Sequence, residues 1–103
     1  MPGVGPVARI RVMTRRRVPF WWVPGNRNIT GLTLWNRIYL KEGAASFELL
    51  FHELTHVEQF RRSPLLFPLR YIIHHFRYGY ADNPAEVEAR ERSEALMKLY
   101  RVA

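Results

Sequence analysis

The pattern of apolar and polar positions divides the chain into a first part with strand periodicity and a second part with helical periodicity. Apolar and basic residues alternate over residues 7–13, and this period of two predicts a half-buried strand. Residues 29–35 and 37–41 predict a hairpin that turns near Asn36. The Gly- and Pro-rich residues 1–6 predict a flexible leader before the first strand.

The second part of the chain predicts three helices. Residues 44–62 lack Gly and Pro, and apolar residues recur there at the spacing of a buried helix face. A Ser-Pro pair and an Asn-Pro pair, each typical of a helix start, predict further helices over 64–78 and 84–100. We therefore expect one α+β domain, residues 1–103, in which a small antiparallel sheet within 7–41 packs on about three helices.

The helix predicted over 44–62 carries the sequence His-Glu-Leu-Thr-His, beginning at His52. His52 and His56 are one helical turn apart on the same face, the spacing at which two imidazoles bind one zinc ion. Glu53 is adjacent, where a carboxylate can act as general base on a water molecule at the metal. The alternative is a buried structural histidine pair, but burying these groups without a partner costs free energy.

A catalytic zinc site of this type needs a third protein ligand and an open position. We expect the ligand to be Glu86, because the first turn of the third helix could approach the histidines from the opposite side. Asn83 and Glu86 also have the spacing of a capping box, in which the Glu86 side chain would bond the cap amide instead. Glu88 is the rival ligand, and the further alternatives are His74, His75 or the absence of a third protein ligand.

Other polar residues are candidates for supporting roles. Glu48 and Gln59 flank the motif on its own helix, and Asp82 precedes the third helix. These residues and Glu88 could serve as further ligands or orient the zinc-bound histidines. An oxyanion formed during hydrolysis could be stabilised by one of four residues: His74, His75, Tyr78 and Tyr80.

The motif residues, His52-Glu-Leu-Thr-His56 followed by a Glu86-x-Glu-Ala89 helix, resemble those of the gluzincin metallopeptidases. The chain is most similar to the minimal stand-alone forms and to small domains with a His-Glu-Leu-x-His-x-x-Gln signature. The resemblance implies a zincin-like fold, catalytic Zn²⁺ bound by His52, His56 and Glu86, and substrate pairing along a strand beside the metal helix. The chain departs from the pattern at Arg90, where many gluzincins have an aspartate that orients a zinc-bound histidine.

Composition limits the possible metal ligands and the expected cellular location of the protein. The 103 residues include no cysteine, so zinc would depend on histidine and carboxylate ligands. The net charge of +7 arises within residues 1–43 and could attract nucleic acid, anionic lipid or acidic peptides, although we favour the arginine-rich surface of a heat-adapted protein. No apolar run is long enough to span a membrane and no signal-peptide core is present, so we expect a cytoplasmic protein.

Two adjacent tryptophans, Trp21 and Trp22, follow three consecutive arginines. They could stack on nucleic-acid bases or lie at a membrane interface. We favour a structural role, with one tryptophan in the core and the other covering its edge.

The function expected from these features is zinc-dependent hydrolysis of peptide bonds in a peptide or unfolded protein, with Glu53 as general base. One alternative is a zinc-binding interaction module, associated with a toxin or with secretion, whose hydrolytic activity is weak or absent. Another is a basic nucleic-acid-binding protein with a structural metal. The oligomeric state is left open.

Overall fold

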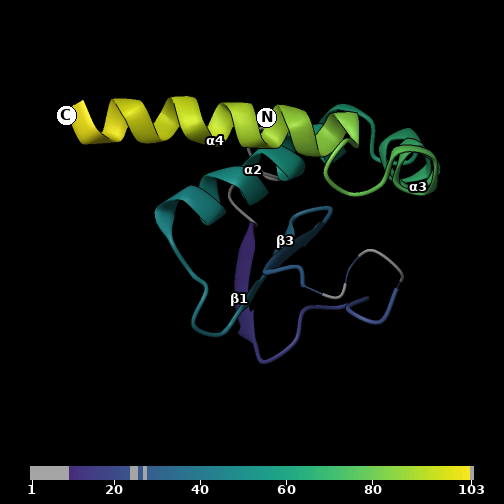
Figure 1. The fold of residues 1–103 in the computed structure, drawn as a ribbon, viewed down its shortest axis with the longest axis horizontal. Helices are drawn as coiled ribbons and strands as arrows, with labels where there is room; N and C mark the ends of the chain where they lie inside the picture. The colour runs from purple at the N-terminus through teal and green to yellow at the C-terminus, as the bar shows by residue number, and fades with distance from the viewer. Residues whose placement is uncertain (1–9, 24–25, 27, 103) are drawn as a thin grey trace.

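The computed structural model describes residues 10–23, 26 and 28–102. It confirms an α+β fold in which a sheet precedes three helices (Figure 1). The strands are β1 (Arg11–Arg15), β2 (Gly31–Leu34) and β3 (Arg37–Lys41), and the helices are α2 (Phe47–Arg62), α3 (Leu66–Tyr78) and α4 (Pro84–Val102). The predicted leader, residues 1–6, lies outside the described residues, and so does the start of the first predicted strand.

The sheet is mixed, with the strand order β1-β3-β2. β2 and β3 form the expected antiparallel hairpin, in which Leu32 pairs with Tyr39. β1 pairs with β3 in parallel, with Val12 opposite Ile38, so the prediction of a wholly antiparallel sheet is wrong. The connection between β1 and β2 is long. It therefore allows β3 to pair with β1 in either the parallel or the antiparallel direction. β2 therefore pairs with β3 along only one of its edges in the described sheet.

Helix α2 lies between the sheet and α4 (Figure 1). It begins after Ser46, whose side-chain oxygen accepts a hydrogen bond from the Leu49 amide at 3.0 Å. Its apolar face buries Val57 against Ile38 and Leu40, and this cluster forms the core between α2 and the sheet. This packing fixes the position of the histidine motif of α2 relative to β2.

Helix α3 begins at Leu66, two residues later than expected, because Ser63 ends α2 instead of starting α3. Pro68 then falls in the first turn of α3, where a missing N–H leaves no hydrogen bond unmade. Phe67 and His75 form the buried face of this helix. Gly79, at φ 84°, ends it by donating its amide to the His75 carbonyl at 2.9 Å.

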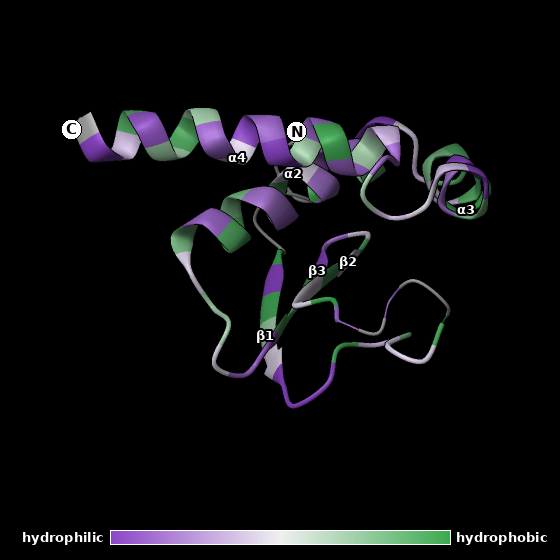
Figure 2. Cartoon of the chain, in the orientation of Figure 1, coloured by the Kyte–Doolittle hydropathy of each residue, from purple (hydrophilic) through white to green (hydrophobic). Residues whose placement is uncertain are grey.

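Helix α4 begins at Pro84, as expected, and extends to Val102. The side-chain oxygen of the fully buried Asn83 accepts from the Ala85 amide at 3.1 Å, and its Nδ2 donates to the Tyr71 carbonyl at 3.1 Å. Hydrophilic and hydrophobic residues alternate along α4 (Figure 2), and its buried residues include the small Ala89 and Ser93, which allow close packing. Asn83 therefore fixes the start of α4 against α3.

The two tryptophans differ from expectation. Trp21 and Trp22 are 40% and 67% exposed, so neither is buried in the core. Residues 16–23 form turns and bends with no strand, and Arg17 lies over the Trp21 ring. No helix among the described residues combines the length and apolarity that crossing a membrane would need.

Candidate metal centre

Two histidines of α2 and one glutamate of α4 converge on one point. His52 Nε2 lies 2.8 Å from Glu86 Oε1, and His56 Nε2 lies 3.1 Å from the same oxygen. One ligand atom from each residue lies within 4.8 Å of the other two, so the three could hold a metal ion. The structure thus brings together the three ligands predicted from the sequence.

The capping-box alternative for Glu86 does not form. The Asn83 amide donates to the Tyr80 carbonyl at 3.3 Å, and the Glu86 carboxylate faces the histidines. The cap is made by Asn83 itself, which frees the Glu86 side chain. The first turn of α4 therefore presents this carboxylate to α2.

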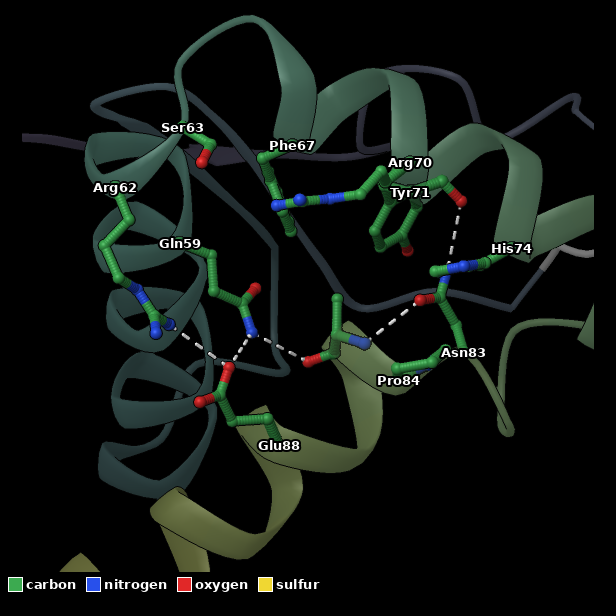
Figure 3. Close-up of a pocket in the computed structure, with 11 residues that line it drawn as sticks. Gln59, Arg62, Ser63, Phe67, Arg70, Tyr71, His74, Asn83, Pro84 and Glu88 are labelled. Carbon is green, nitrogen blue, oxygen red and sulfur yellow. Dashed lines mark hydrogen bonds and ion pairs between the residues drawn. The ribbon is translucent and has the colours of Figure 1, made fainter.

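Glu88 lies on the far side of Gln59 from the histidines and is not a ligand in this arrangement. Its carboxylate accepts from Gln59 Nε2 at 2.6 Å and from Arg62 at 3.3 Å (Figure 3). The hydrogen bond from Gln59 and the charge of Arg62 lower the pKa of Glu88. Gln59, Arg62 and Glu88 are among the residues that line a pocket of about 380 Å³.

Gln59 orients His56. Both amide hydrogens of Gln59 are committed, one to the Ala85 carbonyl at 3.2 Å and one to Glu88 (Figure 3). Its Oε1, 2.7 Å from His56 Nδ1, must then accept from that nitrogen. A neutral His56 is thereby restricted to the tautomer whose Nε2 lone pair points at Glu86, which is the form that binds a metal.

Arg90 occupies the position where the resemblance would place an orienting aspartate. Its guanidinium donates to the Ala81 carbonyl at 2.7 Å and so secures the loop before α4. Gln59, named from the sequence as a supporting candidate, occupies the orienting position next to His56 instead.

Tyr71 of α3 is a member of the site that the sequence analysis did not identify. Its hydroxyl donates to Glu86 Oε2 at 2.5 Å, so the two carboxylate oxygens have separate partners. Burial, followed by the charge of Glu86, raises the pKa of Tyr71, and the hydroxyl remains a donor. In the sequence, Tyr71 lies one helical turn before His75 and so on the same face of the predicted helix. This spacing could have indicated a role for Tyr71, but any tyrosine on a packed helix face has the same spacing to its neighbours.

The electrostatics favour positive charge between the ligands. Burial opposes a charged His56, yet the hydrogen bond and charge of Glu86 raise the His56 pKa to about 9. Burial would raise the pKa of Glu86, but hydrogen bonds from His52 and His56 hold it well below its usual range. Without a metal, His56 therefore holds a proton that faces Glu86. A metal cation could take the place of this proton.

Glu53 is 1% exposed and lies beneath β2. Its Oε1 accepts from the Thr33 hydroxyl at 2.7 Å, and a side chain at Gly31 would meet its Oε2 at 2.8 Å. Burial raises the pKa of Glu53, although the charges of His56 and His52 and the bond from Thr33 act in the opposite direction. Gly31 therefore provides the space in which this carboxylate sits.

A cleft of about 390 Å³ opens beside these groups. Glu53, His56 and Glu86 form part of its lining, and strand β2 forms one side. Aromatic and aliphatic residues make up most of the remaining wall. Two of the three candidate metal ligands, His56 and Glu86, thus face a cavity large enough for a small segment of a substrate.

The remaining candidates separate into two groups. His75 and Tyr80 line the cleft. His74 packs beside Tyr78 at a ring distance of 5.5 Å, and neither residue is part of the cleft lining, so the structure does not support them as oxyanion stabilisers. The two other candidates for ligand or supporting roles, Glu48 and Asp82, are exposed and do not line the cleft either.

Comparisons with family models, curated proteins and solved structures give no match to this chain. The geometry of the site therefore carries the functional argument.

Proposed function

We propose that the protein is a zinc-dependent metallopeptidase of the gluzincin type, with His52, His56 and Glu86 as metal ligands and Glu53 as general base. The observation that carries the proposal is the convergence of two imidazole nitrogens on one buried carboxylate oxygen beside a cleft that also contains Glu53. Two histidines and a glutamate are a ligand set of catalytic zinc sites.

The contact between His56 and Glu86 requires a proton or a metal ion between the two atoms. Because His56 Nδ1 donates to Gln59, the Nε2 lone pair of a neutral His56 faces the lone pairs of Glu86 Oε1 at 3.1 Å. This contact is repulsive unless a proton or a metal ion lies between the atoms. Zinc bonds of about 2.0–2.1 Å in a tetrahedron separate neighbouring ligand atoms by roughly 3.3 Å. The two contacts to Glu86 are shorter than this by a few tenths of an ångström, and the ligand atoms of His52 and His56 lie within 4.8 Å of each other.

The groups around the site suit amide hydrolysis. A zinc ion bound here would polarise a substrate carbonyl and acidify a water molecule. Glu53 would accept the proton and then donate it to the leaving amine, and its burial moves its pKa toward the range useful for both steps. Thr33 holds one oxygen of Glu53 and so fixes the direction of the other.

The substrate would bind as an extended peptide along β2. This strand lines the cleft and pairs with β3 along one edge, so its other edge could accept a further strand. His75 and Tyr80, which also line the cleft, are the candidates to stabilise the oxyanion.

The experiment that tests this proposal is hydrolysis of a mixed peptide library by the zinc-loaded protein. We expect cleavage by the wild type and a loss of about three orders of magnitude or more in Glu53→Gln, with zinc retained, because general base catalysis is removed. Glu48→Gln, an exposed glutamate on the same helix, is the matched control and should cleave like the wild type. Equal cleavage by Glu53→Gln would refute the assignment of the base, and an inactive zinc-loaded wild type would favour an interaction module.

A further inference from the structure

Helix α3 has an apolar face that is largely exposed in the described structure. Six large apolar residues on it or at its start are at least 53% exposed: Leu65, Leu66, Leu69, Ile72, Ile73 and Phe76. Leu65, Leu69, Ile72 and Phe76 follow one another at steps of four, three and four, so they lie along one side of the helix. The buried side of α3 is formed by different residues, among them Phe67 and His75.

The same region carries positive charge only. No aspartate or glutamate occurs from Gln59 to Ala81, whereas four arginines do. Arg70 and Arg77 are exposed on α3, and neither forms an ion pair with a carboxylate of the described residues. Their stems can lie along the apolar face while the guanidinium groups reach outward.

The apolar surface continues beyond α3. Phe20 and Trp22, which are 45% and 67% exposed, line the same cleft as Ile72 and Phe76. Phe20 and Trp22 are also in ring contact with each other, at 6.1 Å. An exposed tryptophan beside an amphipathic basic helix is typical of proteins that lie in a lipid interface.

We propose that this surface, the six exposed apolar residues of the α3 region with Phe20 and Trp22, docks the protein on an anionic lipid bilayer. The apolar side chains enter the interface, and Arg70 and Arg77 contact the acidic headgroups. Charge decides between this occupant and a second copy of the chain. Two α3 faces in contact would bring four arginines together with no acidic residue of that face to pair them.

Docking would also position the cleft. Because Ile72 and Phe76 belong to both the apolar face and the cleft lining, the cleft would open at the bilayer surface. If the proposed hydrolase function holds, polypeptide segments that leave the membrane become the favoured substrates. The docking itself needs neither metal nor hydrolysis, so its failure and that of the proposed function are distinguishable.

The test is cosedimentation of the full chain with vesicles of phosphatidylcholine, with or without phosphatidylglycerol. We expect binding about tenfold stronger or more to the anionic vesicles, weakened by salt, with a blue shift of tryptophan emission that is reduced in Trp22→Phe. The double variant Leu69→Ser/Ile73→Ser, outside the cleft lining, should lose about tenfold or more of this binding. Leu99→Ser, an exposed leucine on α4, is the matched control and should bind like the wild type.

The outcomes separate the possible occupants. Arg70→Gln/Arg77→Gln should weaken binding to anionic vesicles and leave the weak binding to neutral vesicles unchanged. Absence of vesicle binding, or equal binding by Leu69→Ser/Ile73→Ser, overturns the proposal. A lipid-free dimer in light scattering that Leu69→Ser/Ile73→Ser converts to a monomer would assign the face to a second copy instead. Circular dichroism of each variant confirms that a loss of binding is not a loss of folding.

Discussion

The Nδ1 atom of His56 lies 2.7 Å from Oε1 of Gln59, and this contact sets which nitrogen of His56 faces Glu86. Gln59 can play this role because its own amide group is held by Glu88 and by the Ala85 carbonyl. The orientation of the histidine thus depends on a hydrogen-bond chain that joins α2 to the first turn of α4.

Gln59→Leu should weaken zinc binding by about 10- to 100-fold, because His56 loses the partner that fixes its tautomer and ring orientation. Competition with a chelating dye measures the affinity. The neighbouring Glu58→Gln changes an exposed residue of the same helix and should leave the affinity unchanged. Unaltered affinity in Gln59→Leu would show that the hydrogen bond has no part in metal binding.

Gly31→Ala should destabilise the protein by about 1–3 kcal/mol, because the added carbon would meet Glu53 Oε2 at 2.8 Å and Leu49 at 3.2 Å. Urea denaturation measures the free energy of unfolding. If Glu53 causes the strain, the cost of Gly31→Ala should be smaller in a Glu53→Ala background than in the wild type. Equal costs in both backgrounds would contradict the close approach of β2 to this carboxylate.

Thr33→Val should cost about 1–3 kcal/mol of stability, because the buried Glu53 carboxylate loses its hydroxyl donor. Thr55→Val is the comparison, since among the described residues the Thr55 hydroxyl bonds the Phe51 carbonyl one turn earlier in its own helix. Its effect should be clearly smaller in the same urea titration. A similar effect of the two substitutions would argue against a specific role for Thr33.

The stability of the metal-free protein should fall as pH rises from about 6.5 to about 9. The folded state raises the pKa of His56 from 6.5 to about 9, so its contribution is complete below pH 6.5 and is lost as pH passes through 9. Glu86 acts in the opposite sense, because its lowered pKa contributes stability that is lost only as pH falls below its ordinary value of 4.5. Burial raises the pKa of Glu53, and its contribution is present in acid and declines as pH rises.

Thermal denaturation in a chelator across this pH range measures the effect. Saturating zinc should remove the decline above pH 6.5, because the metal replaces the proton between His56 and Glu86. A metal-free stability that stays constant from pH 6.5 to 9 would show that His56 is not held by Glu86 as described.

The helices and the candidate metal ligands were predictable from the sequence because each depends on local spacing. His52 and His56 share a helix, and an Asn-Pro start fixes where Glu86 falls on α4. The direction of β1 was not predictable, because parallel and antiparallel pairing with β3 bury similar side chains. The roles of Thr33 and Tyr71 depend on how β2 and α3 pack against α2, which no local pattern records.

The central claim is that His52, His56 and Glu86 bind one metal ion, and the most direct measurement is the zinc content of purified protein by elemental analysis. With saturating zinc, the account predicts about one zinc per chain in the wild type and in Glu88→Ala, which loses only one support of Gln59, and little or none in Glu86→Ala. Zinc retained by Glu86→Ala, or absent from a folded wild type supplied with the metal, would contradict it.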